Sequence, residues 1–332
     1  MAVLQCVEDG KLDLDEDIRP MIPKIGKHGI ITGFDDEQGS AILKPDNTPI
    51  TLRLLLSHTS GHEYEWLNPY LTKWRALRNE PPLGGPTVEG KSALPLVFAP
   101  GTGFAYGAGH DWAGRLVEVA TGSSLEDFMR KRIWAQLGIE NEMSFFPKTK
   151  ENMRDRIADI STLDKEGKPP AVDAPEFDML LGATECHGGA GVYTSAKAYY
   201  TFLTAVLRRH PMLLTPSSYA ELFRPQLDEQ REQALNDYIA LSPDHTNFLG
   251  LQILPSVRKT WSFAGLVAKE AQPGRFNEGT VMWAGVGSTM WFIDSQAGVC
   301  GTAFCQIVPA LHPSVVALHA QFQSGVFEVV NG

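Results

Sequence analysis

Apolar side chains recur at helical spacing through the first 210 residues. The pattern predicts helices over residues 3–9, 52–56, 111–120 and 124–138, and another after a glycine-rich turn at 187–191. In the third of these, Trp112, Leu116 and Val117 fall on one face, and Gly122 is placed to end the helix. Ser124 and Asp127 have the spacing of a capping box.

The last hundred residues have a different pattern. Strand-like runs at 281–283, 290–293 and 300–306 are separated by Gly or Asp turns, and residues 313–327 form a closing helix. We expect this helix to turn five side chains inward, namely Val315, Val316, Leu318, Phe322 and Val326. Helices followed by an antiparallel meander indicate an α+β fold.

We expect one domain over residues 1–332. Residues from about 15 to 245 are expected to form a mainly helical subdomain with insertions, and residues from about 246 to 332 the sheet strands and the C-terminal helix.

Composition excludes several classes of partner. The 332 residues carry 29 basic and 39 acidic side chains, a net charge of −10, which argues against nucleic acid. No apolar run reaches the length of a membrane span, and no signal peptide is visible, so we expect a cytoplasmic protein that does not bind a membrane. Four cysteines give no disulfide framework, and Cys300 and Cys305 are expected to be buried apolar residues.

Two motifs carry candidate chemistry. Residues 51–61 read Thr-Leu-Arg-Leu-Leu-Leu-Ser-His-Thr-Ser-Gly, and residues 104–114 read Phe-Ala-Tyr-Gly-Ala-Gly-His-Asp-Trp-Ala-Gly. In this order they resemble the SxxK serine hydrolases, which include penicillin-binding proteins, class C β-lactamases and related esterases and acyltransferases. The second motif is similar to that of the fungal transesterases of the lovastatin acyltransferase type. The resemblance implies a β-lactamase/transpeptidase-like fold, an antiparallel sheet with flanking helices plus a helical subdomain.

The resemblance makes Tyr106 the candidate general base or proton shuttle. In the family, a serine ester forms after a lysine and this tyrosine remove the serine's hydroxyl proton. A phenol has a pKa of about 10, so it acts as a base near neutral pH only beside a positive charge. The alternative is that Tyr106 is an ordinary packed loop residue.

A third motif follows at Trp283-Ala284-Gly285, where many esterase-like members have Trp-x-Gly. By position, the backbone N–H of Val286 is the expected oxyanion donor, and Gly285 would let substrate approach the strand closely. The alternative is an ordinary strand with a glycine bulge. Lys91 and Phe177 fall near positions that line the cleft in transesterases, although no motif places them.

The family's Ser-x-x-Lys motif opens a helix upstream of residues 51–61. Here residues 1–15 look like the back half of that helix, so the nucleophile is expected before residue 1, and the family's N-terminal helix and strands are lacking. One edge of the sheet would then be exposed. Three accounts compete: a sequence that starts at an internal Met, an inactive relative, and an active protein with an unrecognised nucleophile.

The resemblance implies an acyltransferase of secondary, polyketide-type metabolism. The donor would be an acyl carrier protein or acyl-CoA thioester, and the acceptor a small-molecule alcohol; no cofactor or metal is expected. A carboxylesterase and a catalytically inactive binding module are the alternatives. Hydrolysis of β-lactams is disfavoured, because Gly107-Ala108 replaces the last two residues of Tyr-x-Asn and Trp283 replaces the lysine of Lys-Thr-Gly.

Other candidates are weaker. Residues 256–259 are the one literal Ser-x-x-Lys, but they come after the tyrosine motif. The turn at 187–191 resembles an α/β-hydrolase oxyanion loop, yet no Gly-x-Ser-x-Gly exists, so a structural role is expected. His58 and His62 have no third zinc ligand. An aromatic stripe at four-residue spacing could cover the cleft or belong to the core; it consists of Trp66, Tyr70 and Trp74.

Overall fold

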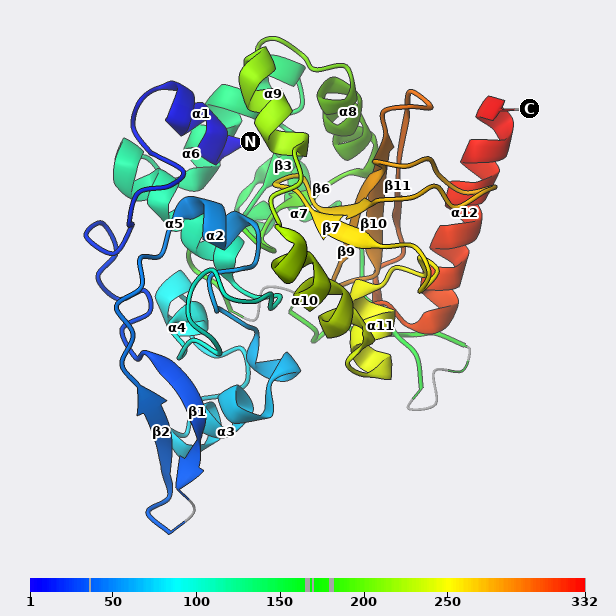
Figure 1. Cartoon of the computed structure of the whole chain (residues 1–332). Coiled ribbons are helices and arrows are strands. Elements are labelled where there is room, and N and C mark those ends of the chain that lie inside the picture. Colours follow the sequence, from blue (N-terminus) through cyan, green and yellow to red (C-terminus); the bar gives the residue numbers. More distant parts are fainter. Residues whose placement is uncertain (36, 165–167, 169, 179–181, 332) are drawn as a thin grey trace. The chain divides into compact units, whose positions relative to one another are not determined.

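A computed structural model describes residues 1–331 except 36, 165–167, 169 and 179–181. The chain forms two compact units (Figure 1). The first comprises Met1–Met129, Leu180–Gly191 and Gln226–Leu235, and the second comprises Arg130–Met179, Val192–Pro225 and Asn236–Gly332. The expected single domain, mainly helical up to about residue 245 and followed by the sheet strands and the C-terminal helix, stays a prediction.

The first unit is mainly helical and carries one β-hairpin. Its elements are α1 (Ala2–Glu8), β1 (Ile30–Asp35), β2 (Ser40–Lys44), α2 (Leu52–Leu56), η1 (Glu65–Leu67), α3 (Pro69–Leu77), α4 (Val88–Ser92), α5 (Gly109–Thr121) and α6 (Leu125–Met129). β1 and β2 pair antiparallel, with an irregularity between Ile31 and Gly33. The helices predicted over 3–9, 52–56 and 111–120 are confirmed.

Helix α5 is the centre of this unit, because α1, α2, α4 and α6 all pack against it. Trp112, Leu116 and Val117 are almost fully buried, as their shared face predicts. Gly122 ends the helix in the left-handed conformation, with φ 68°.

The helix expected over 124–138 is interrupted. Ser124 caps the helix, since the N–H of Asp127 donates to Ser124 Oγ at 3.0 Å, and the Ser124 hydroxyl in turn donates to Asp127 Oδ2 at 2.7 Å. The α-helix nevertheless ends at Met129, and it continues as a π-helix, η2 (Arg130–Trp134), and a 3₁₀ turn, η3 (Ala135–Leu137). Ile133 and Trp134 are both buried in this altered winding, which an α-helical pattern does not foresee.

The aromatic stripe is not one helix face. Trp66 lies in η1 and is 43% exposed, while Tyr70 lies in the first turn of α3 and is 47% exposed. Only Trp74 packs on a core cluster, which is formed by Ile31, Leu71 and Leu94. Asn68 caps α3 between the first two aromatic residues, so helical spacing does not hold across the stripe.

The second unit combines a five-stranded sheet with helices. Its elements are η2 and η3, β3 (Met143–Ser144), η4 (Pro147–Thr149), α7 (Glu151–Arg154), β4 (Ser161–Thr162), β5 (Val172–Asp173), β6 (Tyr193–Thr194), α8 (Ala196–Leu207), α9 (Pro216–Phe223), α11 (Pro243–Leu249), β7 (Lys259–Trp261), β8 (Leu266–Ala268), β9 (Val281–Gly285), β10 (Thr289–Asp294), β11 (Val299–Phe304), β12 (Ile307–Val308) and α12 (Pro313–Asn331). Helix α10 (Glu229–Ala240) crosses the boundary between the two units.

The large sheet is antiparallel, in the order β11-β10-β9-β8-β7, which confirms the predicted meander (Figure 1). Phe304 contacts Tyr199 of α8, whereas Gly301, on the alternate face of β11, lies beside Phe322 of α12. The two helices therefore cover opposite faces of the sheet. Among the described strands of this sheet, β11 pairs with β10 alone and forms one edge.

The inward face predicted for α12 is partly wrong. Val315 and Val316 are buried, and the Phe322 ring packs on Phe292 of β10 although 39% of Phe322 is exposed, but Leu318 is 54% exposed. The buried face continues instead through two polar side chains, His319 and Gln323, because each has a polar partner below it. His319 Nε2 lies 3.4 Å from Cys305 Sγ, and Gln323 Oε1 accepts a hydrogen bond from the buried Arg275.

The cysteines follow the prediction in part. Cys300 is buried on β11, with Sγ 3.6 Å from Thr204 Oγ1. Cys305 is only half-buried, since β11 ends at Phe304 and the chain turns at Gln306, where φ is 53°. No described helix is both long enough and apolar enough to span a membrane.

A buried ion pair holds η1, α3 and α4 together in the first unit. Arg75 Nε lies 2.9 Å from Glu65 Oε1, and both side chains are 3% exposed. Arg75 Nη2 also donates to the carbonyl oxygen of Lys91 at 2.6 Å, and Glu65 Oε1 accepts from the N–H of Leu83. Loss of Arg75 would leave the Glu65 carboxylate buried without the positive charge beside it.

We expect Arg75→Met to lower the free energy of unfolding by about 3–5 kcal/mol, because it strands the Glu65 carboxylate. Urea unfolding followed by tryptophan fluorescence measures the change. Arg78→Met is the matched control on the same helix; Arg78 is half exposed and pairs with Glu80 at 2.7 Å, so it should cost less than about 1 kcal/mol. Equal losses in both variants would contradict the assignment.

Candidate functional site

Tyr106 lies in the loop that leads into α5, and this loop runs along the turn at residues 58–64. The N–H of Ala105 donates to the carbonyl oxygen of His58 at 3.0 Å, and the N–H of Gly107 donates to His58 Nδ1 at 3.4 Å. The carbonyl oxygen of Tyr106 accepts from the N–H of Tyr64 at 3.2 Å. The backbone on both sides of Tyr106 is therefore attached to this one turn.

Glycine allows this close approach. A Cβ at Gly107 would run into the carbonyl oxygen of His62 and lie 2.7 Å from Glu63 Cα, and a Cβ at Gly109 would run into the carbonyl oxygen of Leu55. Both obstacles are backbone atoms, which cannot turn aside as a flexible side chain does. The Tyr-Gly-x-Gly spacing therefore has a steric origin.

Aromatic rings surround Tyr106. Its ring centroid lies 4.8 Å from that of His58 and 5.4 Å from that of Tyr64, which meets it edge-on. Tyr64 Oη makes a long 3.4 Å contact with Asp111 Oδ2, and Asp111 Oδ1 accepts from the N–H of Gly189 at 2.9 Å.

Burial keeps the groups next to Tyr106 neutral. It holds the pKa of His58 well below its usual range, with a further contribution from His110, and it lowers the pKa of His62 to about 4. Burial and the neighbouring Asp111 raise the pKa of Tyr64 well above 10. None of these three groups supplies the positive charge that would help a phenol to act as a base.

The glycine-rich turn at 187–191 has a structural role. The N–H groups of Ala190 and Gly191 donate to the carbonyl oxygen of His187, and Gly188 lies with its Cα against Gly114 of α5. His187 Nδ1 is 3.6 Å from Asp111 Oδ1. The turn thus packs on α5 through Asp111, in agreement with the structural role expected for it.

The third motif occupies β9 in the second unit. Trp283 meets Trp261 edge-on at 4.7 Å and pairs across the sheet with Trp291. Gly285 ends the strand opposite Thr289, and Val286 follows it in the hairpin with 45% of its surface exposed. These three residues are brought together as a local group.

Lys91 and Phe177 lie in different units. Lys91 belongs to α4 of the first unit, and its N–H donates to the carbonyl oxygen of Thr87 at 3.0 Å. Phe177 follows β5 in the second unit and is 40% exposed. The roles assigned to these two residues, and to Tyr106, Trp283, Gly285 and Val286, stay predictions.

Sequence reasoning missed two residues that contact Tyr106, namely His58 and Tyr64, and it also missed Asp111, which contacts Tyr64. His58 and Asp111 belong to the two motifs. Membership of those motifs was the sequence signal that could have identified them. Tyr64 lies three residues beyond the first motif, and only the fold brings it to Tyr106.

The literal Ser-x-x-Lys at 256–259 does not have the helical geometry of a nucleophile and its lysine. Ser256 lies in a turn before β7, and Lys259 is the first residue of that strand. The Lys259 side chain is 4% exposed, and its Nζ donates to the carbonyl oxygen of Leu254 at 3.0 Å. The two side chains are therefore not one helical turn apart.

No three His, Cys, Asp or Glu side chains in the described part of the chain form a group that could hold a metal ion. His58 Nδ1 accepts from Gly107, while His62 Nδ1 lies 2.9 Å from Ser60 Oγ. The two rings are thus engaged with different partners.

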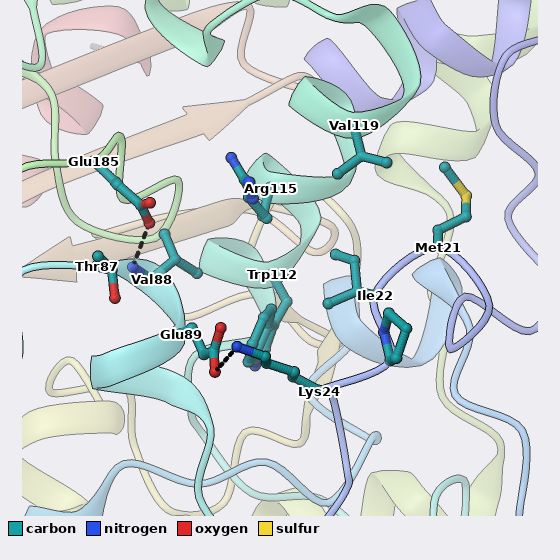
Figure 2. Close-up of a pocket in the computed structure, with 11 residues that line it drawn as sticks. Met21, Ile22, Lys24, Thr87, Val88, Glu89, Trp112, Arg115, Val119 and Glu185 are labelled. Atoms are coloured by element: carbon teal, nitrogen blue, oxygen red, sulfur yellow. Dashed lines mark hydrogen bonds and ion pairs between the residues drawn. The ribbon is translucent and has the colours of Figure 1, made fainter.

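A cavity of about 270 Å³ lies beside α5 in the first unit (Figure 2). It is lined by Met21, Ile22, Pro23, Lys24, Thr87, Val88, Glu89, Trp112, Arg115, Val119 and Glu185. Its four charged groups already have partners: Lys24 Nζ lies 2.8 Å from Glu89, Arg115 pairs with Glu118 at 2.8 Å, and Glu185 accepts from the N–H of Val88. None of the predicted site residues lines this cavity.

Known proteins resemble this chain over most of its length. The Beta-lactamase family profile matches residues 1–324. The lovastatin esterase of Penicillium rubens is 36% identical over 309 residues, which cover 93% of this chain and 76% of that protein. The monacolin J acid methylbutanoyltransferase of Aspergillus terreus is 34% identical over 337 residues, which cover 97% and 79%.

Solved structures agree with these relatives. A mutant simvastatin synthase (LovD) from Aspergillus terreus matches with a TM-score of 0.88 at 32% identity, covering 99% of this chain and 79% of that one. EstCE1, described as a hydrolase with promiscuous acyltransferase activity, matches with a TM-score of 0.68 at 20% identity and supports the fold alone. The proteins that this chain resembles therefore include both transferases and esterases.

Acidification is expected to destabilise the first unit through His62. The folded-state pKa of about 4 lies below the value of about 6.5 for an unfolded histidine, so the unfolded chain binds more protons between these values. The stability from neutral His62 is complete above a pH of about 6.5 and falls by roughly 3 kcal/mol towards pH 4. Urea unfolding from pH 8 to 4 measures it.

His62→Asn is the comparison variant, because its Oδ1 can stand beside Ser60 Oγ in place of Nδ1 but does not titrate. Its stability should depend less steeply on pH by that same amount. Parallel curves for the two proteins would show that His62 does not titrate as stated.

Proposed function

The chain belongs to the beta-lactamase family, and on this premise we propose that it transfers an acyl group from a thioester to the hydroxyl of a small molecule. The observation that carries the proposal is the placement of Tyr106. Its two chain neighbours are bonded to His58, and the glycines beside it allow backbone contact that leaves little room for movement.

Tyr106 would move protons in both halves of the reaction. In the first half, a serine oxygen forms a bond to the thioester carbonyl, the C–S bond breaks, and the serine's proton passes through Tyr106 to the departing thiol. In the second half, the acceptor's hydroxyl oxygen attacks the serine ester. Its proton returns through Tyr106 to the serine as the ester bond breaks.

The other predicted residues would act on the carbonyl and the substrate. Val286 would donate its backbone N–H to the oxyanion, and Gly285 would leave space for the acyl group beside the strand. Trp283 would present an aromatic surface, since its ring is only partly buried. Lys91 and Phe177 are proposed as further substrate contacts.

The relatives support a proposed donor and acceptor. A methylbutanoyltransferase that acts on monacolin J acid suggests a short branched acyl group and a polyketide-derived alcohol. An acyl carrier protein or coenzyme A would present the acyl group as a thioester. Beta-lactam hydrolysis is not proposed, because Gly107-Ala108 and Trp283 replace the polar anchors of that reaction.

Ester hydrolysis is the second candidate, and one observation favours it. The lovastatin esterase of Penicillium rubens is 36% identical to this chain. Both activities share the acyl-enzyme and differ in whether an alcohol or water attacks it, so the identity of the second nucleophile decides between them.

The first test is Tyr106→Phe. We expect the rate of acyl transfer from a short-chain acyl thioester to fall by about 10²- to 10⁴-fold, because the phenol oxygen moves the proton. Since residues 1–332 carry no helical Ser-x-x-Lys, the assay uses protein translated from the longest in-frame transcript. Intact-mass spectrometry first establishes that this protein forms an acyl adduct, and peptide mapping then locates the serine.

Tyr219→Phe is the matched control, because it removes a hydroxyl from a buried tyrosine whose Oη donates to the carbonyl oxygen of His210 at 3.1 Å. It should lose stability but not rate. If Tyr106→Phe transfers acyl groups as fast as this control, Tyr106 does not carry the proton. A protein that forms no acyl adduct at all would instead be a binding module.

The second test counts products. With an acyl thioester and excess polyketide alcohol, a transferase should form more acylated alcohol than free acid, as measured by liquid chromatography with mass detection. Free acid in excess at every alcohol concentration would instead establish the esterase.

A further inference from the structure

His58 is bonded to the chain on both sides of Tyr106. Its carbonyl oxygen accepts from the N–H of Ala105 at 3.0 Å, and its Nδ1 accepts from the N–H of Gly107 at 3.4 Å. The His58 ring also packs on the Tyr106 ring at 4.8 Å, with 52° between the planes. The Tyr106 backbone can therefore shift only if a contact with His58 breaks.

His58 is itself held in place. Its φ of 56° lies in the left-handed region, which non-glycine residues seldom adopt, and its N–H donates to the carbonyl oxygen of Leu55 at 3.3 Å. The side chain is 3% exposed and lies between the rings of Phe104 and His110 as well as that of Tyr106. A residue stays in this costly conformation only when its contacts with the surrounding structure hold it there.

The bond from Gly107 also determines the tautomer. Because the backbone N–H is the donor, Nδ1 must carry the lone pair, and the ring proton is on Nε2. Burial and the neighbouring His110 hold the pKa of His58 well below its usual range, so the ring keeps this lone pair at neutral pH.

We propose that His58 is a positioning residue for Tyr106: its carbonyl oxygen and Nδ1 hold residues 105–107 so that the phenol oxygen stays where proton transfer needs it. Any benefit to catalysis rests on the function proposed above for Tyr106. The positioning itself is a physical property, and it can be tested without any assay of activity.

Two substitutions separate the acceptor from the bulk of the ring. Asn places Oδ1 at the same number of bonds from the backbone as Nδ1, and it tolerates the left-handed conformation better than most residues. Leu supplies apolar bulk but no acceptor, and it is disfavoured at this φ. His58→Asn should therefore keep Tyr106 in place, whereas His58→Leu should release it.

The experiment is a ¹⁹F spectrum of protein labelled with fluorotyrosine. The chain has eight tyrosines, and the Tyr106 resonance is the one that disappears in Tyr106→Phe. We expect His58→Leu to shift and broaden this resonance, and His58→Asn to keep it close to its position in the unsubstituted protein.

His319→Leu is the matched control. His319 is also 3% exposed and loses a polar contact, with Cys305 Sγ, but it belongs to α12 of the second unit. It should lower stability without altering the Tyr106 resonance. A general effect of deleting a buried imidazole would appear in this control as well.

The rates give an independent readout. In the form of the protein that makes the acyl-enzyme, His58→Leu should lower kcat by about 10- to 100-fold with KM within about two-fold, because misplacement affects the reacting group rather than substrate binding. His58→Asn should recover most of that loss. If His58→Leu does not fold, His58→Gln replaces it, since its amide lies one bond too far out.

Two results would overturn the inference: an unchanged Tyr106 resonance in His58→Leu, or the same displaced resonance in His58→Asn as in His58→Leu. The proposed function fails in a different way. If the resonances behave as expected but neither Tyr106→Phe nor His58→Leu slows the reaction, His58 does position Tyr106, and Tyr106 is not the proton carrier.

Discussion

The arrangement of the first unit depends on a direct approach of two backbone segments. Residues 105–109 lie close against residues 55–63, because Gly107 and Gly109 face the carbonyl oxygens of His62 and Leu55. A Cβ at either position would push the loop away. The bonds from Ala105 and Gly107 to His58, and from Tyr64 to Tyr106, would then lose their geometry.

That approach removes polar groups from water, and desolvation then decides their charge. His58 and His62 stay neutral and Tyr64 stays protonated, so the surroundings of Tyr106 can accept or donate hydrogen bonds without competing for its proton. Asp111 lies in the first turn of α5, and its Oδ1 accepts from the N–H of Gly189.

The second unit also has to supply hydrogen-bond partners to a buried polar group. Arg275 is buried under α12, and its guanidinium donates to Gln323 Oε1 and to the carbonyl oxygens of Leu251 and Gln252. Burial lowers its pKa to about 10. The need to satisfy this group brings Gln323 inward, while Leu318 on the same helix remains exposed.

The sequence alone determined the family, the fold class, about half of the α-helices and the strands β9, β10 and β11, since periodicity, caps and turn residues act over a few neighbouring positions. It also singled out Tyr106 from its motif. Tertiary structure alone decided the π-helical winding after Met129, the buried face of α12 and the contacts of Tyr106 with His58 and Tyr64. These depend on which partner lies opposite each residue. Local pattern specifies which side chains are apolar, but not which polar ones will find a buried partner.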